Sequence, residues 1–141
     1  MVRFPAYRTI LCATDLLPVA RRAAQIAECL GAWLVLVHVI DHFPVDGPTP
    51  GPGAPQDRFV QEAQERLDAL GRRLVGWART RAFACVTRGP ASDKPAQLVE
   101  LEGADLLVVG SWAEETLTGA LGTAAGALVE STACDVLLVR P

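Results

Sequence analysis

Unbroken apolar runs alternate along this chain with segments in which apolar residues recur at helical spacing. Most of the runs show no polar alternation, which is typical of parallel strands that are covered on both faces. The predicted strands are Arg8–Thr14, Trp33–Ile40, Ala82–Arg88, Leu106–Val109 and Asp135–Val139.

The segments between these runs are predicted to be helices. They extend from Asp15 or a neighbour to Leu30, over Asp57–Thr80, from Ser92 or Asp93 to Gly103, and from Gly122 to about Ser131. Glycine just after an apolar pattern and Ser or Asp just before one are the usual stop and start signals. In the short third helix, Leu98, Val99 and Leu101 are expected to form the buried side.

Strands that alternate with helices in this way predict an α/β fold, in which a five-stranded parallel sheet carries helices on both faces. Ligands of such sheets bind beside the carboxyl ends of the strands, at the point where the strand order reverses. We expect residues 1–141 to form a single domain. The Pro- and Gly-rich stretch 41–56 is predicted to be a surface loop within it.

Composition excludes several classes of protein. The net charge of −3 and the scattered basic residues argue against a nucleic-acid surface. No apolar run approaches the roughly 20 residues of a membrane-spanning helix. The first residues lack the apolar core of a signal peptide, so the protein is predicted to be cytoplasmic.

The residues that usually carry catalysis or metal binding are isolated from one another. Cys12, Cys29, Cys85 and Cys134 lie far apart, and we expect them to be small buried side chains. His38 and His42 have no carboxylate at catalytic spacing. The sequence therefore predicts neither an enzyme nor a metal site.

The segment Asp105–Thr123 carries the main candidate chemistry. A buried strand ends at Gly110, a polar loop follows, and Gly122 stands at the start of a helix. The free N–H groups and the dipole at the start of a helix favour an anion such as phosphate.

Five segments together resemble the universal stress protein (UspA) superfamily. They are Ile10–Asp15, Val37–Asp41, Arg88–Ala91, Ala104–Ser111 and Cys134–Pro141. The resemblance implies a Rossmann-like sheet of the adenine nucleotide alpha hydrolase type with strand order 3-2-1-4-5. It also implies a homodimer that pairs through the last strand, Asp135–Val139, whose exposed edge would otherwise favour aggregation.

Nucleotide-binding members of this superfamily carry the motif G-x-x-G-x9-G-S/T around the phosphates and ribose. Gly110 matches its first glycine, and Gly122-Thr123 matches its closing pair, whereas Ala113 replaces the second glycine and the spacer is one residue short. The resemblance further implies that Asp15 contacts the ribose or adenine, and that Val39 and Val109 line the base pocket.

Glu114 and Glu115 stand where the family usually has a basic residue, and each would repel a polyphosphate by about 1 kcal/mol. We therefore expect a degenerate nucleotide loop, no required cofactor, and a regulatory stress-response protein that acts through dimerisation and partners. The alternative is a sensor that binds ATP or AMP. Asp15 could equally be a helix cap, and for Thr123 capping is the favoured interpretation. A third alternative, a flavodoxin-like enzyme, is disfavoured because the first strand has no glycine-rich loop after it.

Overall fold

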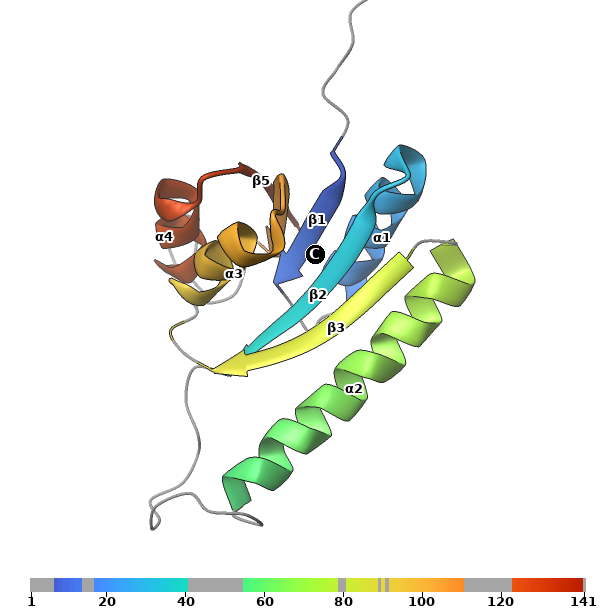
Figure 1. Cartoon of the computed structure of the whole chain (residues 1–141), viewed down its shortest axis with the longest axis vertical. Coiled ribbons are helices and arrows are strands. Elements are labelled where there is room, and N and C mark those ends of the chain that lie inside the picture. The colour runs from blue at the N-terminus through green and yellow to red at the C-terminus, as the bar shows by residue number, and fades with distance from the viewer. Residues whose placement is uncertain are drawn as a thin grey trace, which may run out of the picture.

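The computed structural model describes residues 7–13, 17–40, 55–78, 81–88, 90, 92–110 and 123–140. Within these ranges strands and helices alternate along the whole chain (Figure 1). The elements are β1 (Thr9–Ala13), α1 (Leu17–Leu30), β2 (Trp33–Ile40), α2 (Pro55–Ala78), β3 (Arg81–Arg88), α3 (Lys94–Glu102), β4 (Leu106–Gly110), α4 (Thr123–Ser131) and β5 (Asp135–Val139). None of the described helices is long and apolar enough to cross a membrane.

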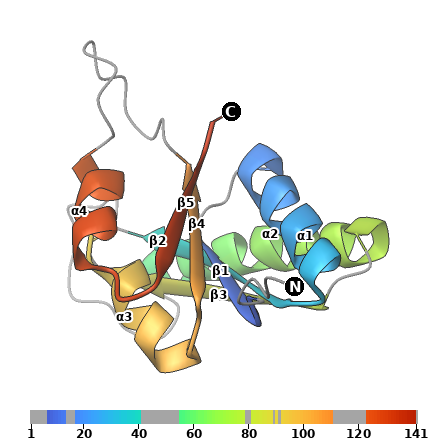
Figure 2. The same ribbon diagram turned by 90° about the horizontal axis from the view of Figure 1, so that it is seen from above.

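The five strands form one sheet in the order β3-β2-β1-β4-β5. Every pairing is parallel, so the predicted fold class and strand order are confirmed. Helices α1 and α2 lie on one face of the sheet, and α3 and α4 lie on the other (Figure 2).

The central strand β1 supplies the core on both faces. Ile10 and Cys12 pack with α1 and α2, while Leu11 packs on the opposite face with residues of α3 and α4. All three side chains are 0% exposed. Burying a side chain such as Ile10 or Leu11 stabilises a protein by about 1.5–3 kcal/mol. Burial on both faces explains why this strand is an unbroken apolar run in the sequence.

A carboxylate fixes the start of β1. The Asp105 side chain, just before β4, accepts hydrogen bonds from the backbone N–H groups of Arg8 (2.9 and 3.1 Å) and Thr9 (3.1 Å). The Asp105 N–H in turn donates to the Thr9 carbonyl at 3.0 Å, and the Trp33 N–H donates to the Arg8 carbonyl at 2.9 Å. The amino end of β1 is therefore held between β2 and β4.

Several sequence-based boundaries need correction. The long helix begins at Pro55 and ends at Ala78, so the predicted loop 41–56 loses its last two residues to α2, and its remainder lies outside the described residues. Proline is acceptable in the first turn because its missing N–H would have no helical partner there. Asp93 precedes α3, but its side chain makes no capping hydrogen bond.

Two predictions of burial are wrong. Leu101 is 79% exposed. Pro95 and Val99 define the buried side of α3, and Leu101 lies about 200° around the helix axis from Val99. Of the four cysteines only Cys12 is buried, whereas Cys29 is exposed at the end of α1 and the other two are half-buried.

Glycine ends α1 in a left-handed conformation. Gly31 has φ 64°, and the Ala32 N–H donates to the Ala27 carbonyl at 2.8 Å, which is the Schellman pattern of a helix end. Gly126, by contrast, lies inside α4, where an added Cβ would meet open space.

We expect opposite effects from the same substitution at these two glycines. Gly31→Ala should lower the free energy of unfolding by about 1 kcal/mol because L residues disfavour positive φ, and Gly126→Ala should raise it by about 0.5–1 kcal/mol through helix propensity. Urea denaturation measures both changes. Two shifts of the same sign would contradict the assignment of helix end and helix interior.

We expect Asp105→Ala to lower the free energy of unfolding by about 1–3 kcal/mol, because two backbone N–H groups lose their acceptor. The matched control is Asp93→Ala, which removes a carboxylate without a capping bond and should stay within about 0.5 kcal/mol of the parent. Urea denaturation of the parent and the two variants measures both changes in the free energy of unfolding. Equal effects of the two substitutions would show that the Asp105 carboxylate does not hold β1.

Candidate functional site

The candidate site lies where the sheet reverses its direction of growth. From β1 the chain adds β2 and then β3 on one side, and it then crosses over to add β4 and β5 on the other side. The carboxyl end of β1 therefore lies between strands whose connections leave in opposite directions, which opens a crevice in sheets of this kind. Ala13 marks this end of β1 and pairs with Val37 and Val109.

Val39, Ala13 and Val109 lie near this edge of the sheet, and we call these three residues the apolar floor. All three belong to the side-chain cluster on the α3 and α4 face of the sheet. Val109 is only 4% exposed, whereas Val39 and Ala13 are half-buried. The structure thus brings together the two valines that the family resemblance assigns to a base pocket. Apolar side chains at a strand edge of this kind can support the flat face of a ring.

Ala13 is the member of this floor that the sequence reasoning missed. Its register places it directly beside Val109 on β4 and beside Val37, two residues before Val39 on β2. The available signal was a small residue next to the end of the first apolar run. A small side chain leaves room for a ligand between the two flanking valines.

Gly110 and the start of α4 provide the polar part of the site. Gly110 is the last residue of β4 and is partly exposed. Because β4 and β5 are parallel, α4 must run back along the sheet, which places its first turn near the carboxyl edge of the strands. That first turn contains no acidic residue. Its backbone N–H groups and the helix dipole therefore favour an anion.

Thr123 is the first residue of α4, so it lies at the helix start where the sequence placed it. Its role as a phosphate contact or as a helix cap stays a prediction. Asp15, Ala113 and Gly122 lie outside the described residues, as does the Glu114-Glu115 pair. Their predicted roles stay predictions.

The thiols of Cys12 and Cys134 are poor nucleophiles. Burial raises the pKa of Cys12, which lies on the opposite face of β1. Loss of solvent contact is also the largest cause that raises the pKa of Cys134, which packs near the floor. Both side chains therefore remain neutral thiols near neutral pH. Among the described residues, no group of three or more His, Cys, Asp or Glu side chains could hold a metal ion.

A separate hollow of about 140 Å³ lies on the other face of the sheet, between β2 and α2. The described residues that line it are His38, Ala63, Arg66, Leu67 and Leu70. His38 is half-buried in β2 and points toward α2. Its described lining includes none of the residues that the sequence assigned to a nucleotide site.

Comparison with known proteins finds relatives that match nearly the whole chain. The model of the universal stress protein family matches residues 6–140. Universal stress protein A homolog 1 from Coxiella burnetii is 32% identical over 142 aligned residues, which cover 94% of this chain and 96% of the relative.

Two solved structures share the fold over nearly the whole chain. A universal stress protein in complex with cAMP is 26% identical with a TM-score of 0.70, and the match covers 95% of this chain and 97% of that one. The universal stress protein UspA from Lactobacillus plantarum is 16% identical with a TM-score of 0.77, covering 97% and 100%. On the family match, the relative and the shared fold, this chain belongs to the universal stress protein family.

Proposed function

We propose that this universal stress protein is a cytoplasmic regulatory protein that acts by dimerising and by binding protein partners, and that it is not an enzyme. Its nucleotide loop is degenerate, so it needs no bound cofactor. One contrast carries the proposal. The apolar floor of Val39, Ala13 and Val109 is in place, but the loop sequence that would hold phosphates carries Ala113 and the acidic pair Glu114-Glu115.

Charge is the main physical reason for this assignment. Phosphates at the start of α4 would gain from the helix dipole by about 0.3–1 kcal/mol. Two carboxylates in the loop that leads to this helix would each oppose them by about 1 kcal/mol even at a surface-like dielectric. The repulsion is therefore as large as the attraction or larger.

The alternative is a nucleotide sensor that binds ATP or AMP. Its ligand would contact Asp15, Val39, Val109, Gly110, Gly122 and Thr123. Two observations favour it: the first turn of α4 lacks acidic residues, and a relative of the same fold at 26% identity is described in complex with cAMP. The two candidate functions share the floor and differ only in whether the loop tolerates phosphate.

Dimerisation is assigned to β5, an edge strand of the sheet. Burial alternates along this strand, and Leu137 is 36% exposed. An apolar strand edge with unpaired backbone groups is a template for pairing with another chain. A second copy that pairs through the same strand about a two-fold axis closes the assembly at a dimer.

The test of nucleotide binding is a titration with ATP and, separately, with AMP while the melting temperature is followed. We expect no shift for the parent at millimolar nucleotide. A bound nucleotide at 100 times its Kd would instead add about 2.7 kcal/mol of stability. A large shift in the parent would establish the sensor and overturn the degenerate loop.

The charge argument predicts a gain of binding in the double variant Glu114→Lys/Glu115→Lys. The matched control is Glu100→Lys/Glu102→Lys, which makes the same change of charge at exposed positions near the end of α3. We expect a nucleotide-dependent rise in melting temperature for the first variant only. Equal behaviour of the two variants would show that the acidic pair is not what prevents binding.

For the dimer, we expect Leu137→Lys to weaken self-association by about tenfold or more, because a charge would be buried at the strand pairing. Leu30→Lys is the matched control, since Leu30 is 42% exposed but lies at the end of α1. Sedimentation equilibrium gives the dissociation constants, and circular dichroism checks that both variants fold. An unchanged constant for Leu137→Lys would place the dimer contact elsewhere.

A further inference from the structure

The outer edge of β3 is occupied by a side chain of α2. The Gln64 amide nitrogen donates to the Ala84 carbonyl at 3.3 Å, and the Val86 N–H donates to the Gln64 amide oxygen at 3.1 Å. The other hydrogen of this amide is directed to Asp68, whose Oδ1 accepts at 2.9 Å. Both amide hydrogens and the amide oxygen of Gln64 therefore have a hydrogen-bond partner.

These two bonds have the pattern of a parallel sheet. A residue of a parallel strand donates its N–H to one carbonyl of its neighbour and accepts from the N–H two residues further on. The Gln64 amide does the same to Ala84 and Val86, and it thereby brackets Cys85. Its side chain thus makes the two hydrogen bonds that the N–H and C=O of one residue in a sixth parallel strand would make.

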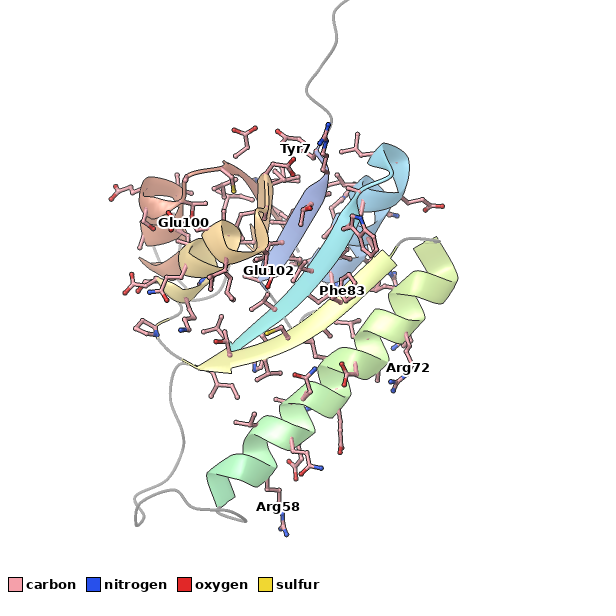
Figure 3. All side chains as sticks on the ribbon, viewed as in Figure 1. Tyr7, Arg58, Arg72, Phe83, Glu100 and Glu102 are labelled. Atoms are coloured by element: carbon pink, nitrogen blue, oxygen red, sulfur yellow. The ribbon has the colours of Figure 1, made fainter. Side chains whose placement is uncertain are left out.

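The placement of α2 supports this geometry. The helix runs beside β3 along the border of the sheet (Figure 1). Ala63 and Leu67 face the core, while Gln64 and Asp68 are half-buried at its margin. Arg58 and Arg72 point away from β3 (Figure 3). Gln64 is therefore a polar residue held between the core face and the solvent face of α2.

We propose that Gln64 blocks the β3 edge against strand addition by a second copy of this chain, whose β5 edge is the strand that would otherwise pair there. A β3-to-β5 contact is heterologous, so it would continue the parallel sheet from copy to copy without closing. By occupying β3, Gln64 leaves β5 free for the proposed two-fold dimer. The block itself does not require that dimer to form.

The test compares Gln64→Leu with Gln61→Leu. Both substitutions replace a glutamine of α2 by leucine, but Gln61 is exposed and precedes Gln64 by less than one turn. Sedimentation velocity over a concentration series should show Gln64→Leu at about twice the parent's mean mass or more, rising with concentration, because the assembly is open-ended. Gln61→Leu should match the parent.

Adding Leu137→Lys to Gln64→Leu should abolish the larger species, because the added strand is β5. A folded Gln64→Leu protein with the parent's mass at every concentration would overturn the block, whatever the oligomeric state of the parent. Larger species that persist with Leu137→Lys would overturn β5 as the partner strand. The mass of the parent alone tests the proposed dimer.

A measurement on the parent protein covers the case in which Gln64→Leu does not fold. The Ala84 N–H faces the same edge as the Val86 N–H, because residues two apart in a strand point the same way, but Gln64 accepts only from the Val86 N–H. Hydrogen exchange at Val86 should be slower than at Ala84 by about tenfold or more, because a hydrogen bond must open first. Equal exchange at the two amides would show that Gln64 does not hold this edge.

Discussion

The burial of β1 on both faces is the constraint on which the rest of the structure depends. Ile10, Leu11 and Cys12 are fully buried, and β2 and β4 pair with the strand on either side. A parallel strand that is apolar on both faces is buried fully when it lies in the middle of a sheet whose two faces are both covered by helices. The sheet order β3-β2-β1-β4-β5 places this strand at the point where the strand order reverses, which is where ligands of such sheets bind.

The sequence predicted those parts of the fold that depend on local pattern. β2 and β5 begin and end at the predicted residues, and a charged residue follows each apolar run, Asp41 after β2 and Arg140 after β5. Leu101 was mispredicted because helical periodicity does not show how far the packing partners of a helix extend, and Cys29 was mispredicted because its burial was inferred from its residue type. The exposure of these two side chains is decided by tertiary neighbours, which no local pattern encodes.

The candidate site likewise has a part that could be predicted from the sequence and a part that could not. Val39 and Val109 could be placed on one floor because the strand order fixes their register, and Ala13 completes that floor. Phosphate recognition depends instead on the loop between β4 and α4, where the resemblance supplies a motif and this chain departs from it at Ala113. A fold can supply a crevice without supplying the charge that a ligand needs, so function must be argued from the loop chemistry.

The two edges of the sheet differ in a way that bears on assembly. At β5, exposed Leu137 leaves apolar surface beside a strand edge. At β3, a side-chain amide from α2 makes hydrogen bonds that an added strand would make. An open sheet with two equal edges can grow at both, whereas a sheet with one occupied edge can only pair through the other. Pairing through β5 alone is self-complementary and would end at two copies, so the difference between the edges is what the proposed dimer requires.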